Sequence, residues 1–252
     1  MGRNSHITLD TVLYAHSRRI DYELKVDWQE RHGLLKAAFD LDIRSAFVKN
    51  EIQFGNLDRP TTRNNSIEAA KFEVCNQKWS DLSETHYGAA LLNDCKYGIS
   101  AQGNCLMLTL MKGGSRPDPK TDLGVHTMRY ALLPHEGAFS AESVVREAYA
   151  FNYLPKLFNG VFRAPKLFEI DAPGIICEAV KPADDVPDAF VLRLYECERN
   201  HTNAKLKLYD LKKVCITNFL EEKTGDVSLN ADGVCELEFG PFEIKTLLIE
   251  RQ

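Results

Sequence analysis

The sequence predicts an all-β fold, with two sets of antiparallel sheets joined by a short helical linker, and three observations support this. The run IDYELKVDW (residues 20–28) alternates apolar and polar residues strictly, which is the period of a half-buried strand. Further strand-like runs are separated by clusters of Gly, Pro, Asn and Asp, such as GNLDRPTTRNNS (55–66), which favour turns. A single segment spaces its apolar residues as a helix does.

Residues 1–139 are predicted to form the main β domain. After the first strand comes the turn QERHG, and residues 35–43 then alternate in the same way. The two runs are therefore predicted to pair as a long antiparallel hairpin. Shorter strand-like runs continue the domain: 50–54, 70–76, 88–92, 104–111 and 126–133.

The pattern changes at Ser140. The segment SAESVVREAYAFNYL (140–154) offers a Ser N-cap, an acidic first turn and apolar residues at helical spacing. A Pro-containing link follows, so residues 140–174 are predicted to be a linker with one helix. Residues 175–252 are predicted to form a small C-terminal β-sandwich from a second set of strands: 175–180, 190–196, 204–210, 213–219, 232–239 and 242–250.

Charge and hydrophobicity exclude two classes of partner. The chain carries 31 basic and 36 acidic residues, a net charge of −5, with no Lys/Arg stripe that could neutralise a row of phosphates. No apolar run approaches the roughly 20 residues of a membrane span, and MGRNSHITLD lacks the apolar centre of a signal peptide. We therefore expect a soluble cytoplasmic protein that binds neither nucleic acid nor membrane. The sequence does not define the oligomeric state, and a homo-oligomer is compatible with it.

Several familiar kinds of catalytic site lack their motifs. The seven cysteines include no CxxC pair, and the seven histidines are scattered, so no structural zinc site is predicted. We interpret the cysteines as reduced thiols, mostly buried. No GxSxG, GxGxxG or Walker A motif is present, which argues against serine hydrolysis and nucleotide cofactors.

Three polar clusters on predicted connections are candidates for binding: DRPTTRNN (58–65), NDCKYG (93–98) and KGGSRPDPKTD (112–122). Rigid sheets often present binding groups on their loops, and this mixture of carboxylates, amides and cations suits sugar hydroxyls. The alternative is that Asn and Asp only form turns. For NDCKYG a catalytic site, a ligand-facing rim and a polar turn all stay open. Four aromatic residues could stack on sugars or belong to the core: Trp28, Trp79, Tyr87 and Tyr97.

Long segments of the chain carry a family resemblance. They include RRIDYELKVDWQERHGLLKAAFDLDI (18–43), FEVCNQKWSDLSETHYGAALLNDCKYG (72–98), GNCLMLTLMKGGSRPDPKTDLG (103–124) and GPFEIKTLLIE (240–250). In this order they resemble the C-terminal half of glycoside hydrolase family 38 α-mannosidases of the cytosolic and bacterial type. The resemblance implies a galactose-mutarotase-like supersandwich of antiparallel sheets followed by a small β-sandwich.

The resemblance also implies a function for the whole polypeptide, the retaining hydrolysis of terminal α-mannosides. In this family the catalytic carboxylates and the divalent metal, zinc or a similar ion, belong to an N-terminal catalytic domain. The present chain would then contain no catalytic residue and no cofactor, and would pack on that domain. Two alternatives of the same architecture stay open, a free-standing carbohydrate-binding module and a mutarotase-like epimerase.

The family comparison also implies substrate-binding residues. The basic residue that ends the strand before the KGGSRPDPKTDLG loop is expected near the outer sugars of a mannose-containing oligosaccharide. In this sequence it is Lys112, with Asp118 and Asp122 as neighbours. Relatives often carry Arg there, and Lys supplies a point charge rather than a planar, bidentate contact. Asn93 and Asp94 are further candidates, on an interdomain or rim turn.

Overall fold

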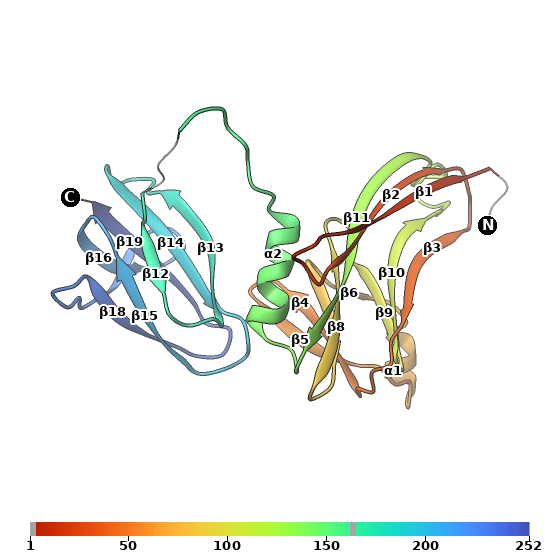
Figure 1. Ribbon diagram of the computed structural model, residues 1–252, viewed down its shortest axis with the longest axis horizontal. Helices are drawn as coiled ribbons and strands as arrows, with labels where there is room; N and C mark the ends of the chain where they lie inside the picture. The colour runs from red at the N-terminus through yellow and green to blue at the C-terminus, as the bar shows by residue number, and fades with distance from the viewer. Residues whose placement is uncertain (1–3, 162–164, 252) are drawn as a thin grey trace. The chain divides into compact units, whose positions relative to one another are not determined.

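The computed structural model describes residues 4–161 and 165–251, and the chain divides into two compact units. The first unit comprises Met1–Gln53 and Leu57–Pro155, and the second comprises Phe54–Asn56 and Lys156–Gln252. Nearly all regular structure is antiparallel β-sheet (Figure 1), which confirms the all-β fold class. The division after Pro155 falls inside the segment 140–174 that was predicted to be a linker.

The larger sheet of the first unit has seven strands in the order β1-β2-β11-β8-β7-β4-β5. Their bounds are β1 (His6–Leu13), β2 (Ile20–Trp28), β11 (Gly124–Glu136), β8 (Tyr87–Asn93), β7 (Trp79–Ser83), β4 (Phe47–Ile52) and β5 (Gly55–Pro60). Strand β1 was not predicted, yet it pairs with β2 along its whole length, from His6 opposite Asp27 to Leu13 opposite Ile20.

The second sheet of this unit has four strands in the order β3-β10-β9-β6. Their bounds are β3 (Leu34–Asp40), β10 (Cys105–Lys112), β9 (Gly98–Gln102) and β6 (Val74–Cys75). Leucine, isoleucine and valine side chains from both sheets form one buried core, which includes Val26, Leu91, Ile99 and Leu108. The short helix α1 (Ser66–Ala70) precedes β6 and was not predicted.

The predicted hairpin of residues 20–28 with 35–43 is wrong. Strand β2 pairs with β1 and β11, whereas β3 pairs with β10 in the other sheet. The two runs share the core between the sheets, and the rings of Tyr22 and Phe39 lie 5.6 Å apart. Alternation therefore identified most of the core-facing side chains, although Asp21, expected in water, is buried. It could not identify the pairing partner, because both a hairpin and two packed sheets bury alternate residues.

The predicted helix is confirmed. It begins with one π-type turn, η1 (Ala141–Val145), and continues as α2 (Arg146–Asn152). Ser140 is the N-cap, and its hydroxyl accepts a hydrogen bond from the Ser143 N–H at 3.1 Å. The helical segment packs on β7, β8 and β11 (Figure 1). Strand β8 is consequently buried on both faces, from Gly88 to Asn93, rather than on alternate residues.

The second unit is also built from two sheets. One has the order β12-β15-β18, and the other β13-β14-β19-β16-β17. The bounds are β12 (Phe168–Ile170), β13 (Ile175–Pro182), β14 (Ala189–Glu196), β15 (Thr202–Leu208), β16 (Leu211–Thr217), β17 (Lys223–Asp226), β18 (Val234–Phe239) and β19 (Ile244–Arg251). Leu192, Leu206, Leu237 and Leu247 pack between the sheets, so the predicted second β-sandwich is confirmed. No helix in the described part of the chain is long and apolar enough to cross a membrane.

Candidate functional site

The structure places the five predicted site residues in two groups within the first unit. Lys112 is the last residue of β10, and Asp118 and Asp122 lie on the connection from β10 to β11. Asn93 is the last residue of β8, and Asp94 follows it and contacts β11 at Arg129. Arg129 is five residues beyond the start of β11, which is about 17 Å along an extended strand. The two groups therefore do not form a common site.

The loop that follows Lys112 is anchored by its backbone. The Gly113 N–H donates to the carbonyl of Gly33 at 2.8 Å, and the Gly113 carbonyl accepts from the His32 N–H at 2.6 Å. A Cβ on Gly113 would lie 2.3 Å from the Glu30 carbonyl oxygen, so this close approach of two backbones requires glycine. These contacts fix the position at which the Lys112 side chain leaves the sheet.

The two aspartates of this loop organise its turns. An Asp118 carboxylate oxygen accepts from the Lys120 N–H at 2.8 Å, as in an Asx-turn. Asp122 adopts the left-handed conformation, with φ of 62°, and its carboxylate accepts from the Lys112 N–H at 3.3 Å. The carboxylate of Asp122 therefore closes the loop back onto Lys112. The structure brings Lys112 and Asp122 together, with Asp118 in the same loop.

A cluster of polar side chains lies next to Lys112 on the face of the four-stranded sheet that is turned away from the core. The Lys36 ammonium lies 3.1 Å from Glu73 and donates to the Ser100 hydroxyl at 3.1 Å. The Thr109 hydroxyl donates to the same Glu73 carboxylate. Burial by itself would raise the pKa of Glu73, but the hydrogen bonds from Thr109 and Lys36, with the charges of Lys36 and Lys112, lower it. Sequence reasoning missed Glu73, because its partners come from two strands distant in sequence, β3 and β10.

Asn93 is a buried residue that shapes the turn after β8. Its side-chain amide donates to the Gln77 carbonyl at 2.6 Å, and its side-chain oxygen accepts from the Lys96 N–H at 2.8 Å. Its backbone carbonyl accepts from the Asn152 amide of α2 at 3.1 Å. Asn93 therefore connects the turn, the residues just before β7 and the end of the helix.

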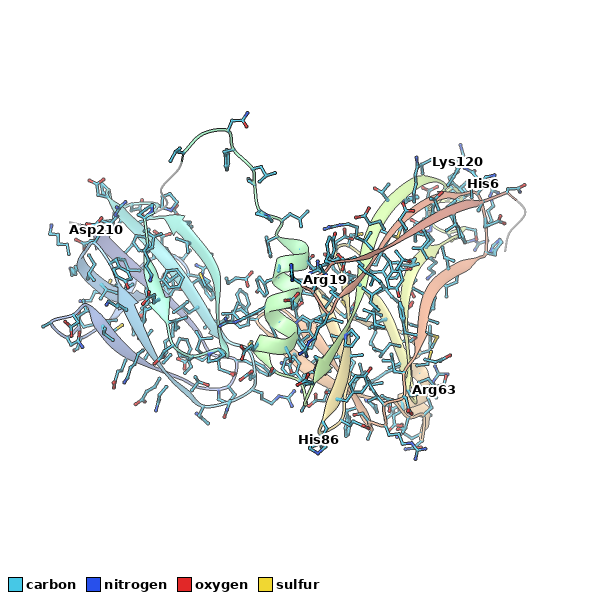
Figure 2. All side chains as sticks on the ribbon, in the orientation of Figure 1. His6, Arg19, Arg63, His86, Lys120 and Asp210 are labelled. Carbon is cyan, nitrogen blue, oxygen red and sulfur yellow. The ribbon has the colours of Figure 1, made fainter. Side chains whose placement is uncertain are left out.

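Asp94 connects the same turn to β11 and, through it, to the helix. Its carboxylate accepts from the backbone N–H of Arg129 at 3.1 Å and from Nε of Arg129 at 3.3 Å. The Arg129 guanidinium donates to the Phe151 carbonyl at 3.1 Å and lies over the Phe151 ring, 4.9 Å from its centroid. Arg19, shown beside α2 in Figure 2, also lies over this ring, at 5.0 Å. The contacts of NDCKYG thus dock the helix on the sheet.

The thiol in NDCKYG is poorly suited to nucleophilic chemistry. Burial and the neighbouring Asp94 raise the pKa of Cys95 to about 11, although the residue as a whole is exposed. A thiol with such a pKa is protonated at neutral pH, whereas the thiolate is the nucleophile. All seven cysteines are free, as predicted. The expectation that most are buried is wrong, since Cys75 and Cys95 are exposed and Cys105 and Cys177 are half-buried.

A buried ionisable pair occurs on the side of the seven-stranded sheet that faces the helical segment. Nε2 of His135 lies 2.7 Å from the Asp81 carboxylate, which also accepts from the Ser83 hydroxyl at 2.8 Å. Burial alone would lower the pKa of His135, but the hydrogen bond and the charge of Asp81 outweigh it and the pKa is raised. Gly88 makes room for the ring, since a Cβ there would lie 2.3 Å from Cε1 of His135.

The candidate stacking aromatics divide into two pairs. Trp28 and Trp79 are core residues, 6% and 1% exposed, and Trp79 stacks on Phe139 with centroids 4.7 Å apart. Tyr87 and Tyr97 are exposed. Across residues 4–161 and 165–251, no group of three or more His, Cys, Asp or Glu side chains has an arrangement that could hold a metal ion.

Comparison with protein families decides the relationship. Residues 2–120 match the glycosyl hydrolases family 38 C-terminal domain, and residues 174–247 match the glycosyl hydrolases family 38 C-terminal beta sandwich domain. The chain belongs to glycoside hydrolase family 38. Both matching models describe C-terminal domains of family 38 proteins, so the resemblance in the sequence is confirmed.

Individual relatives of the chain agree with this assignment. The chain is 36% identical over 258 residues to alpha-mannosidase 2C1 of Homo sapiens, covering 99% of this chain and 25% of that protein. It is 36% identical over 255 residues to alpha-mannosidase G of Dictyostelium discoideum, covering 96% and 23%. The chain therefore spans about a quarter of the length of these relatives. An alpha-mannosidase structure from Enterococcus faecalis V583 shares the fold, with a TM-score of 0.81, 17% identity and coverage of 97% of this chain and 29% of that one.

Proposed function

We propose that the chain is the non-catalytic C-terminal β region of a retaining α-mannosidase that hydrolyses terminal α-mannosides. The observation that carries this proposal is the 36% identity along 99% of the chain to an α-mannosidase of which it spans 25%. Retaining hydrolysis uses two carboxyl groups about 5 Å apart. These groups, and a divalent metal such as zinc, are proposed to belong to an N-terminal catalytic domain of the same polypeptide, as the family resemblance implies.

Within this function, we assign the Lys112 loop to the substrate cleft. The anchored backbone at Gly113 supports this, because a binding group is most effective when its position is fixed before the ligand arrives. Lys112 would donate to hydroxyls of the outer sugars, with Asp118 and Asp122 beside it. A direct contact of Asn93 or Asp94 with substrate stays a prediction.

The remaining parts of the proposal concern partners and location. The chain would pack on the N-terminal catalytic domain and so help to shape the cleft for a mannose-containing oligosaccharide. Likeness to the cytosolic type of family 38 enzyme supports a cytoplasmic location. The proposal includes no requirement for a homo-oligomer.

Substitutions of Lys112 in the longer polypeptide test the cleft assignment. Lys112→Met should lower kcat/KM for a mannose oligosaccharide by about tenfold, the loss of one charged hydrogen bond, and should leave kcat/KM for an aryl α-mannoside nearly unchanged. Lys112→Arg should retain most of the activity, and Lys120→Met in the same loop is the matched control. Equal losses with both substrates, or no loss with either, would contradict the assignment.

The alternative function, a free-standing carbohydrate-binding module, gives a different result in a second experiment. Calorimetric titration of the 252-residue chain with mannose oligosaccharides should show no saturable binding if its loop only completes a cleft. Saturable binding by the chain alone would favour the module.

A further inference from the structure

A second polar site lies at the end of the first unit that carries α1. It is a small cavity of about 20 Å³ between β5 of one sheet and β9 of the other, closed by residues 61–71. That volume holds about one water-sized atom. Figure 2 shows Arg63 at this end of the unit and Lys120 of the Lys112 loop at the opposite end. The cavity belongs to DRPTTRNN, the polar cluster to which the proposed function assigns no role.

The innermost charged group of the cavity is Arg59. Its Nη1 atom is buried and has no hydrogen-bond partner in the described parts of the chain. The carboxylate of the preceding residue, Asp58, already pairs with another cation, since it lies 2.5 Å from the Lys49 ammonium. Burial lowers the pKa of Arg59, opposed by the nearby Cys75, yet an arginine stays charged at neutral pH.

The side chains around Arg59 have an excess of positive charge. Arg63 and Lys71 also line the cavity, and Glu68 is its single lining carboxylate among the described residues, so three cations face one anion. Glu68 is itself engaged in fixing the loop. It accepts hydrogen bonds from the Asn64 N–H at 2.7 Å, from the Thr62 hydroxyl at 3.1 Å and from the Asn65 amide at 3.0 Å.

A partly buried guanidinium without a counter-charge is costly, and a bound anion removes this cost. The excess of two positive charges matches a dianion, and guanidinium groups suit the geometry of phosphate oxygens. Ser100 also lines the cavity and supplies a hydroxyl donor. The Ser100 oxygen accepts a hydrogen bond from Lys36 at 3.1 Å, so the hydroxyl hydrogen of Ser100 stays available for a ligand.

We propose that this cavity is a phosphate-binding site. One phosphate oxygen enters the cavity beside Arg59 and Ser100, and the remaining oxygens stay at the mouth, where the exposed side chains of Arg63 and Lys71 lie. The site takes inorganic phosphate or the phosphate group of a sugar monoester, since both present the same oxygens. It is independent of the proposed α-mannosidase function.

Two measurements on the 252-residue chain test the proposal: calorimetric titration with inorganic phosphate, and the thermal unfolding midpoint at increasing phosphate concentration. The wild type should bind saturably and its midpoint should rise with phosphate. Arg59→Gln should weaken binding by at least about tenfold, since a charge-assisted hydrogen bond is lost. Without phosphate, this variant should melt at the wild-type temperature or above, because it removes an uncompensated charge. A purely structural arginine would give a lower midpoint instead.

Further variants and ligands keep the result unambiguous. Arg63→Gln and Lys71→Gln, at the exposed mouth, should each weaken phosphate binding by about two- to fivefold without loss of the fold. Arg146→Gln, an exposed arginine on α2, is the matched control and should bind like the wild type. If a hexose 6-phosphate competes with inorganic phosphate, the site also binds phosphate monoesters. If it does not compete, the site binds the free ion alone. No saturable binding by the wild type, or equal binding by Arg59→Gln, would overturn the proposal.

Discussion

Replacing Asp94 with alanine tests the structural role of the turn NDCKYG. The Asp94 carboxylate accepts from the backbone N–H of Arg129 at 3.1 Å and from its Nε at 3.3 Å. Arg129 in turn donates to the Phe151 carbonyl at 3.1 Å. Asp94→Ala therefore leaves Arg129 without its counter-charge and weakens the docking of the helix end on the sheet.

The expected loss of stability follows from these contacts. The ion pair is only partly buried, with side-chain exposures of 30% for Arg129 and 23% for Asp94, so we reduce its contribution to roughly 0.5–1 kcal/mol. The hydrogen bond from the backbone N–H to a charged acceptor adds about 1–1.5 kcal/mol. The total is about 2 kcal/mol, which lowers the thermal midpoint of a unit of this size by about 4–8 °C.

Urea denaturation followed by tryptophan fluorescence measures this loss, because Trp79 stacks on Phe139 at the start of the helical segment. Asp94→Asn is the matched control: it keeps an oxygen acceptor for the Arg129 N–H and should cost about half as much. A free energy of unfolding within about 0.5 kcal/mol of wild type for Asp94→Ala would refute the structural role. If that variant instead keeps its stability and, in the longer polypeptide, loses activity on oligosaccharides, the predicted substrate contact of Asp94 is supported.

Three further predictions follow from buried contacts. Asp81 raises the pKa of His135, so the pair should stabilise the fold below pH about 6.5, and this stabilisation should disappear as the pH rises through the raised pKa. In His135→Gln the free energy of unfolding should lack this dependence on pH. A variant whose unfolding free energy depends on pH as the wild type's does would contradict the prediction. Gly113→Ala should cost about 1–3 kcal/mol in unfolding experiments, since its Cβ would lie 2.3 Å from a backbone carbonyl oxygen. Gly114→Ala, with its nearest neighbour at 3.8 Å, should be neutral, and equal effects would refute the argument. Phe151→Ala, at a position 1% exposed, should cost about 3–5 kcal/mol by thermal denaturation, and a loss below about 1 kcal/mol would show that the helix is not held by this ring.

The fold was largely predictable because its signals are local. Strict alternation located β2 and the buried side of β3, and the Ser140 cap with helical spacing located the helix. The true pairing partners of β2 and β3 were not predictable, since the burial of alternate residues is the same whether two strands pair or face each other. Strand β1 was missed because most of its residues are exposed, so its pattern carries little hydrophobic signal.

The polar sites were only partly predictable from the sequence. The loops with Asn, Asp and Gly were recognised, and the turns formed by Asp118 and Asn93 agree with the known preferences of these residues. Their partners were not recognised, because Arg129 meets Asp94 across 35 residues of sequence and Glu73 meets Thr109 across 36. Strand register brings such pairs together, and sequence spacing does not record it.

Hydrolysis of an aryl α-mannoside by the purified 252-residue chain, with divalent metal present, tests the central claim most directly. If the reactive carboxylates and the metal belong to another domain of the polypeptide, product formation should stay at the level of a protein-free blank at every chain concentration. A rate that increases in proportion to the concentration of the chain, and that disappears with a chelator, would show that these residues contain a catalytic centre of their own.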